Sequence, residues 1–150
     1  MENAAPEQSP FSKVTQIGIV VRDMDKAVER LSSLGIGPFK PKLLPPDREE
    51  WFRDRPFDGE VILSSASIGE MEIELVQPVA GESPHQEFLD RQGEGIQHIA
   101  CAVKGLEGHV EKLTNQGCHV LLRARFPGGG GVAYMDLGVA GLIIELVERK

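Results

Sequence analysis

Four polar side chains stand at matching positions of two similar sequence segments, and together they have the chemistry of a metal site. They are Gln16, Glu74, His98 and Glu145. Glu74 and Glu145 each lie in an apolar, strand-like run, where a buried carboxylate is costly unless it is paired or bound to metal. An amide oxygen, two carboxylates and an imidazole suit a divalent cation, Co²⁺, Ni²⁺, Mn²⁺, Fe²⁺ or Zn²⁺. The alternative is four unrelated polar residues on solvated sheet faces.

The matching positions come from an internal repeat. Residues 17–36 (IGIVVRDMDKAVERLSSLGI) align without a gap with residues 99–118 (IACAVKGLEGHVEKLTNQGC), and MEIELVQ at 71–77 matches LIIELVE at 142–148. The two matching segments occur in the same order in each half of the chain. The repeat therefore predicts two copies of one module, residues 14–78 and 95–148, within a single domain that spans 14–150.

Each module is expected to run β-α-β-β-β, so the fold class is α+β with the two module sheets side by side. Met24, Val28 and Leu31 fall on one face of a helix, and glycines follow both predicted helices where left-handed C-caps are common. The predicted strands are 14–21, 39–44, 60–68 and 71–77 in the first module, and 96–103, 118–123, 132–136 and 142–148 in the second. The predicted helices are 24–34 and 105–116, with a further helical turn near 84–91 between the modules.

Side-chain alternation places the four candidate ligands on one sheet face. Ile17, Ile19 and Val21 are expected under the first helix, which leaves Gln16 and Gly18 on the opposite face. The same parity puts His98, Ala100 and Ala102 opposite the second helix. That face carries small residues in both copies, so it leaves room for a ligand.

Composition excludes several function classes. The chain has 150 residues, is 41% hydrophobic and 26% charged, and carries a net charge of −7. Without a basic cluster, a nucleic-acid or anionic-membrane partner is not expected. Residues 1–13 are polar and have no apolar signal region, so they predict a disordered leader and a cytoplasmic protein. Cys101 is interpreted as a buried strand residue, and His85, His109 and His119 as surface residues.

The segments IGIVVRDMDKAVERLSSLGIGPF, IELVQPVAGESPHQEFLDRQGEGIQHIACAV and GLIIELVE resemble the vicinal oxygen chelate superfamily, in particular its methylmalonyl-CoA epimerase branch. That superfamily also contains glyoxalase I and extradiol dioxygenases. The resemblance implies paired βαβββ modules forming a curled eight-stranded sheet around a divalent metal. It implies Gln16, Glu74, His98 and Glu145 as the metal ligands, the same four that the repeat selects. The resemblance also implies that the protein forms a homodimer.

The implied chemistry is proton transfer next to a carbonyl, by an isomerase, epimerase or lyase acting on an acyl-CoA or α-keto compound. The metal serves as a Lewis acid, and Glu145 is both a ligand and a catalytic base. Two departures stand out. The epimerase branch usually has His where this chain has Gln16, and Phe57 stands where the branch has a second glutamate. Asp58, Glu60 and Glu49 are nearby substitutes or solvated loop charges.

Two other functions remain open. A metal-free small-molecule binding protein, like the bleomycin-resistance members, would usually lack the ligand quartet. An extradiol-type dioxygenase would normally use two histidines and one glutamate, whereas this chain has one histidine at a predicted ligand position.

Overall fold

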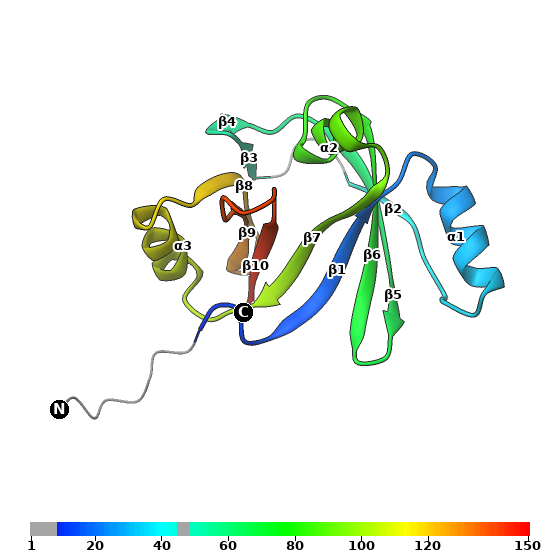
Figure 1. Ribbon diagram of the computed structural model, residues 1–150, viewed down its shortest axis with the longest axis horizontal. Coiled ribbons are helices and arrows are strands. Elements are labelled where there is room, and N and C mark those ends of the chain that lie inside the picture. The colour runs from blue at the N-terminus through cyan, green and yellow to red at the C-terminus, as the bar shows by residue number, and fades with distance from the viewer. Residues whose placement is uncertain (1–8, 45–48) are drawn as a thin grey trace.

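The computed structural model describes residues 9–44 and 49–150, and its strands form one curled, mixed sheet with a helix beside each half (Figure 1). The strand order is β2-β5-β6-β1-β7-β10-β9-β8-β3-β4. The strands are β1 (Val14–Val20), β2 (Lys42–Leu44), β3 (Glu50–Phe52), β4 (Arg55–Pro56), β5 (Glu60–Ile68), β6 (Met71–Ala80), β7 (Gly95–Ala102), β8 (His119–Arg125), β9 (Gly130–Asp136) and β10 (Ile143–Arg149). The helices are α1 (Met24–Ser33), α2 (Pro84–Gln92) and α3 (Leu106–Asn115).

The strand order is the same in both halves when it is read outward from the centre. β1, β6, β5 and β2 form one side, and β7, β10, β9 and β8 form the other. β1 pairs antiparallel with β7 and joins the two halves, whereas β1 with β6 and β7 with β10 are parallel pairs. Equivalent segments of the repeat thus occupy equivalent positions on the two sides of the β1–β7 junction.

The predicted number of eight strands is wrong, because the described residues contain ten. The two additional strands, β3 and β4, form a hairpin whose turn residues Arg53 and Asp54 both have positive φ, 50° and 65°. Hairpin turns of this kind usually carry Asn-Gly or Asp-Gly, and Arg-Asp gives no such signal. β3 then pairs with β8, so a loop of the first half completes the edge of the second half.

Each half has a hydrophobic core between its helix and the outer face of the sheet. α1 packs Met24, with the partly buried Val28 and Leu31, against Leu75 and Ala66, so these three helix residues share one face as predicted. Asp23 caps this helix by accepting a hydrogen bond from the Lys26 amide, and Gly35 follows its end at φ 93°. α3 packs in the same way on β9 and β10.

Among the described residues, α2 covers one end of the inner face of the sheet. α2 lies where β1 ends and β7 begins (Figure 1), and its Pro84, His85 and Leu89 are buried. Ser83 caps α2 by accepting a hydrogen bond from the Gln86 amide, and Pro84 occupies the first helical turn, where a missing N–H costs nothing. On the inner face of β10, Glu145 is buried, Ile143 and Val147 are half-buried and Arg149 is exposed. We call this inner face the groove.

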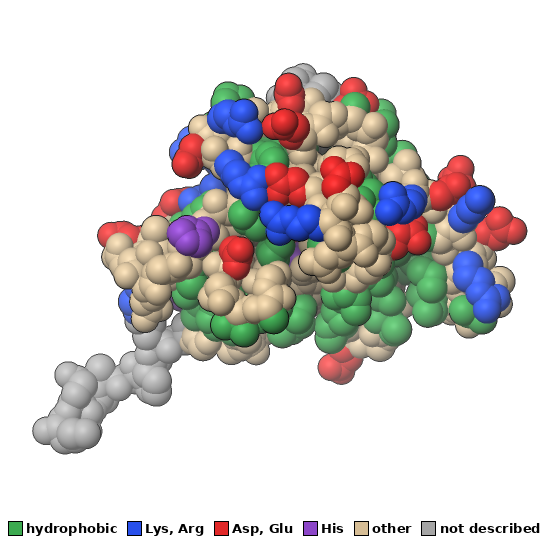
Figure 2. Space-filling view, turned by 45° about the horizontal axis from the view of Figure 1, so that its top comes forward, with side chains coloured by type: hydrophobic (Ala, Val, Ile, Leu, Met, Phe, Trp, Pro, Cys, Tyr) green, Lys and Arg blue, Asp and Glu red, His purple; other side chains and the backbone are tan. Residues whose placement is uncertain are grey.

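Several other expectations can be compared with the structure. Residues 1–8 of the predicted leader lie outside the described residues, and residues 9–12 contain a turn in which the Ser12 amide donates to the Ser9 carbonyl oxygen. Cys101 is buried and both cysteines are free thiols. None of the described helices has the length and apolar character needed to cross a membrane. On the face shown in Figure 2, acidic and basic side chains are interspersed.

Candidate metal centre

The structure brings three of the four predicted ligands together on the inner face of the sheet. Glu74 on β6, His98 on β7 and Glu145 on β10 each offer one ligand atom, and these atoms lie within 4.8 Å of one another. His98 Nε2 is 3.3 Å from Glu145 Oε1 and 3.6 Å from Glu74 Oε1. His98 is 1% exposed, Glu145 8%, and Glu74 is half-buried, so two of the three side chains are shielded from bulk water.

Strand register explains how residues so distant in sequence meet. Gly18 on β1 pairs with Glu74 on one side and with His98 on the other. A Cβ atom built on Gly18 would lie only 2.0 Å from Cε1 and 2.2 Å from Nε2 of His98. The imidazole therefore lies directly across Gly18 to reach Glu74, and no other residue type leaves it that space.

The carboxylates of Glu74 and Glu145 favour a positive charge between them. Burial lowers the pKa of His98, but the adjacent carboxylates of Glu145 and Glu74 outweigh this effect and raise that pKa to about 9. Burial raises the pKa of Glu74, and the neighbouring His98 only partly offsets it. In the absence of an ion, a proton on His98 Nε2 supplies the positive charge between the two carboxylates.

The same atoms fit a divalent ion. Within the described part of the chain, neither His98 Nε2 nor Glu145 Oε1 has a hydrogen-bond partner of acceptable geometry, although both atoms are buried. Metal–ligand bonds of about 2.1 Å at angles of 90–109° separate neighbouring ligand atoms by roughly 3.0–3.4 Å. The observed separations of 3.3 and 3.6 Å lie close to that range. Glu74, His98 and Glu145 would hold such an ion.

Gln16 lies on the same face, one strand from Glu74, but it contacts other residues. Its amide nitrogen donates to Ser65 Oγ and to Glu72 Oε1, both at 3.4 Å. In the register, Gln16 pairs with Glu72 on β6 and with Ala100 on β7, so the small Ala100 separates it from Glu145. Ligation by Gln16 stays a prediction.

Two residues that the sequence interpretation did not assign to the site lie directly behind His98. Gln97 Oε1 is 3.0 Å from His98 Nδ1 and 2.9 Å from His85 Nδ1. The expectation that His85 is a surface residue is wrong: it is 5% exposed, because α2 carries it onto the inner face. The ring of Tyr134 covers both imidazoles, with centroids 4.9 Å from His98 and 5.7 Å from His85.

A further carboxylate faces the groove from β3. Register and alternation place Glu50 on the same side as Phe52, Leu122 and Tyr134. Burial raises the pKa of Tyr134 well above its usual value, and the carboxylates of Glu145, Glu74 and Glu50 add to this. Glu50 was not among the predicted substitutes for the family glutamate. Of those, Asp58 is exposed and Glu60 half-buried, and Phe57 itself is buried at 5% exposure.

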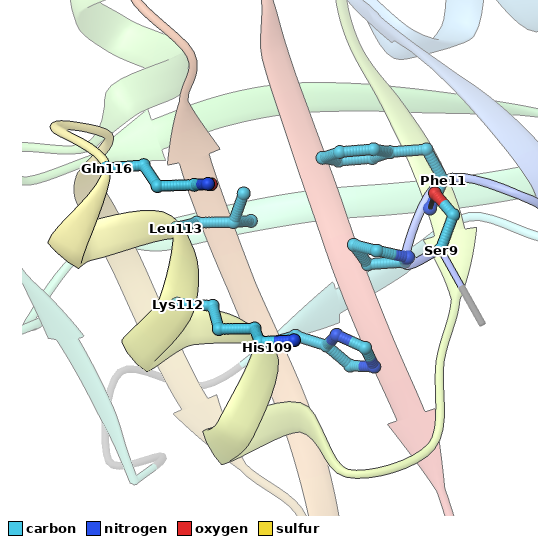
Figure 3. Close-up of a pocket in the computed structure, with 7 residues that line it drawn as sticks. Ser9, Phe11, His109, Lys112, Leu113 and Gln116 are labelled. Carbon is cyan, nitrogen blue, oxygen red and sulfur yellow. Dashed lines mark hydrogen bonds between the residues drawn. The ribbon is translucent and has the colours of Figure 1, made fainter. Parts of the chain in front are cut away.

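Two open hollows lie outside the groove. One of about 290 Å³ is formed where His109, Lys112 and Leu113 of α3, together with its C-cap Gln116, face Ser9 and Phe11 (Figure 3). The other, of about 280 Å³, is lined by Trp51, Asp54, Glu107, Arg123 and Arg125. α3 packs on the outer face of the sheet, so the first hollow lies on the opposite side from Glu145. Neither hollow includes a predicted ligand.

Solved structures with this fold include several named as methylmalonyl-CoA epimerases. The enzyme from Mycobacterium tuberculosis matches with a TM-score of 0.72 and 24% identity, covering 98% of this chain and 94% of that one. The Streptomyces coelicolor epimerase, bound to 2-nitronate-propionyl-CoA, matches with a TM-score of 0.70 and 21% identity over 93% and 98% of the two chains. At these identities the likeness concerns the fold.

The chain is also similar to two proteins from Bacillus species and matches one family model. The Bacillus halodurans protein BH1468 is 29% identical, with a TM-score of 0.65 over 92% of this chain and 94% of that one. The Bacillus subtilis protein YqjC is 33% identical over 87 residues, which are 55% of this chain and 61% of YqjC, so the match spans less than two thirds of that relative. The model of the glyoxalase/bleomycin resistance protein/dioxygenase superfamily matches residues 15–135. The chain therefore belongs to this superfamily, known also as the vicinal oxygen chelate superfamily.

Proposed function

We propose that this chain is a metal-dependent enzyme that transfers a proton at a carbon next to a carbonyl, as an isomerase, epimerase or lyase. The observation that carries the proposal is the convergence of His98 Nε2, Glu145 Oε1 and Glu74 Oε1, with His98 and Glu145 buried and Glu74 half-buried. A buried imidazole between two carboxylates is an expensive arrangement, and a divalent ion turns it into a favourable one. The metal-free binding proteins of the superfamily have no need of it.

Each residue of the cluster then has a role. Glu74, His98 and Glu145 hold the ion, with Gln16 as the predicted fourth ligand. When bound, a divalent ion supplies Lewis-acid stabilisation for the negative charge that builds on a substrate carbonyl oxygen. Glu145 would take up the proton from the neighbouring carbon at a carboxylate oxygen, a role supported by its location on the inner face next to His98.

The groove suggests how a substrate would lie. From Glu145 towards the exposed end, the inner face is built from the small or aliphatic side chains of Ala100, Ala102, Val132 and Val147. At the other end α2 contacts β6, β1 and β7. An extended acyl compound would enter along the open end with its carbonyl foremost. One solved structure with this fold is a methylmalonyl-CoA epimerase in complex with methylmalonyl-CoA, which favours an acyl-CoA as the first substrate class to test.

Proton exchange tests this function directly. Incubation of the metal-loaded protein with methylmalonyl-CoA and other acyl-CoAs in D₂O should move deuterium into the position next to the carbonyl. The variant Glu145→Gln should lower the exchange rate by about 10²–10⁴-fold, the usual contribution of a general base. Glu111→Gln, at an exposed position on α3, is the matched control and should leave the rate unchanged. Tight binding of an acyl-CoA without exchange would instead favour a binding protein.

A further inference from the structure

Gln97 faces the groove because of an irregularity in the pairing of β7 with β1. Ile96 pairs with Ile19 and His98 pairs with Gly18, so Gln97 is the additional residue of a β-bulge. In a regular strand the side chains of Gln97 and His98 would point to opposite faces. Here both are buried, at 5% and 1% exposure, and their side chains touch. The bulge thus brings the amide of Gln97 to the cluster of Glu74, His98 and Glu145, whereas simple alternation would direct that amide to the opposite face of the sheet.

One atom of that amide contacts two imidazoles. Gln97 Oε1 lies 3.0 Å from His98 Nδ1 and 2.9 Å from His85 Nδ1. A carbonyl oxygen only accepts hydrogen bonds, so each imidazole presents an Nδ1–H to it. With its proton on Nδ1, a neutral His98 turns an unprotonated Nε2 towards Glu74 and Glu145. That nitrogen is the atom that can bind an ion, since a ligating histidine donates its other N–H to a neighbouring oxygen.

The end of the amide that faces His98 decides which nitrogen of the imidazole carries the proton. A lone glutamine could also turn its NH₂ group to His98 Nδ1, which would place the imidazole proton on Nε2 and block ligation. The structure instead places the amide oxygen of Gln97 at both Nδ1 atoms, and Gln97 Nε2 has no partner among the described residues. His85 is held in place by the Ser83-capped start of α2 and by the edge of the Tyr134 ring.

We infer that Gln97 and His85 are positioning residues that hold His98 with its proton on Nδ1 and its Nε2 free for a cation. The pair acts through His98 and touches neither the ion nor the substrate. The predicted effect on metal affinity rests on the proposed function, whereas the protonation pattern of His98 does not. The linker helix α2, which belongs to neither repeat, thereby becomes part of the site.

The protonation pattern can be read in wild-type protein without metal. Histidine-selective ¹⁵N NMR distinguishes a protonated from an unprotonated ring nitrogen, and recording it to alkaline pH identifies the form of His98 that carries a single proton. The chain has four histidines, and loss of a signal pair in His98→Asn assigns the one of interest. We expect a protonated Nδ1 and an unprotonated Nε2. A proton on Nε2 would overturn the inference, whether or not the protein binds metal.

Metal affinity supplies the second readout. Gln97→Met keeps the volume but removes the acceptor, and should weaken Co²⁺ or Zn²⁺ binding about 10–100-fold, as the loss of such a partner typically does. Gln97→Glu keeps an acceptor between the two imidazoles and should restore affinity to within a few-fold of wild type. His85→Phe retains the contact with Tyr134 and should weaken binding by a smaller factor. Melting temperatures establish that each variant is folded.

The outcomes separate the inference from the proposed function. Wild-type affinity in Gln97→Met, or equal losses in Gln97→Met and Gln97→Glu, would contradict a positioning role. If Gln97→Met does not fold, His85→Phe and the wild-type NMR measurement still decide the matter. A wild-type protein that binds no metal but shows the Nδ1–H pattern would refute the proposed function and leave the histidine orientation standing.

Discussion

Metal binding to this site should depend steeply on pH, because the ion must displace the proton that His98 holds between Glu74 and Glu145. The pKa of His98 without metal is about 9. At pH 7, two pH units lower, only about one molecule in 100 has a neutral His98. The apparent dissociation constant for the ion should therefore be roughly 100-fold larger at pH 7 than above pH 9. Below pH 9 it should rise about tenfold for each unit by which the pH falls.

Calorimetric titration with Zn²⁺ or Co²⁺ measures this linkage. Titrations between pH 6 and 8 in buffers of different ionisation enthalpy should give about one proton released per ion bound at pH 7. In His98→Asn, which lacks the titrating group, the release of that proton should disappear. A dissociation constant that does not change with pH, or an absence of proton release in the wild type, would refute the reasoning from the geometry of the cluster.

The same proton should appear in the stability of the metal-free protein. His98 has its pKa raised from 6.5 to about 9 on folding, so its contribution is complete below about pH 6.5 and is lost as pH rises through about 9. The raised pKa of Glu74 acts in the same direction. The shift corresponds to at most about 3 kcal/mol. Urea unfolding with chelator should give a lower free energy of unfolding at pH 9.5 than at pH 6.5, and an increase would contradict this prediction.

Three substitutions test other parts of the site. Gly18→Ala would place a methyl group where the imidazole of His98 lies, and should weaken metal binding at least ~100-fold. The control Gly108→Ala, at a position with open space around it, should leave metal affinity unchanged. Equal metal affinities of the two variants would refute the argument that Gly18 makes room for His98. Gln16→His should strengthen binding about tenfold or more if residue 16 is a ligand, since imidazole is a better donor than an amide, and an unchanged affinity in calorimetry would remove it from the site. Glu50→Gln should slow deuterium exchange of acyl-CoAs by about 10²-fold if Glu50 serves the second face of the substrate; an unaltered rate would exclude that role.

Much of the framework follows from periodicity and from the repeat. The strand at 60–68 and the positions of α1 and α3 agree with the sequence prediction to within one or two residues. Alternation also placed Glu74, His98 and Glu145 on one face, and the register of β1 with β6 and β7 brings them together. These features follow from local patterns, which is why the sequence reveals them.

The structural features that the sequence did not predict depend on contacts between residues far apart in the chain. The β3–β4 hairpin has turn residues without a turn signature and is stabilised by pairing with β8. Alternation assigns Gln97 to the outer face, and only the bulge opposite Gly18 reverses that assignment. His85 lies in a polar linker, and its burial depends on where α2 docks on the sheet. None of these is encoded in the spacing of nearby residues.

The central claim is that Glu74, His98 and Glu145 hold a divalent ion. Its most direct test is the metal content of protein purified without chelator, measured by elemental analysis alongside Glu145→Ala. The account predicts close to one divalent ion per chain in the wild type and a large loss in the variant. A metal content far below one ion per chain that the substitution leaves unchanged would contradict it.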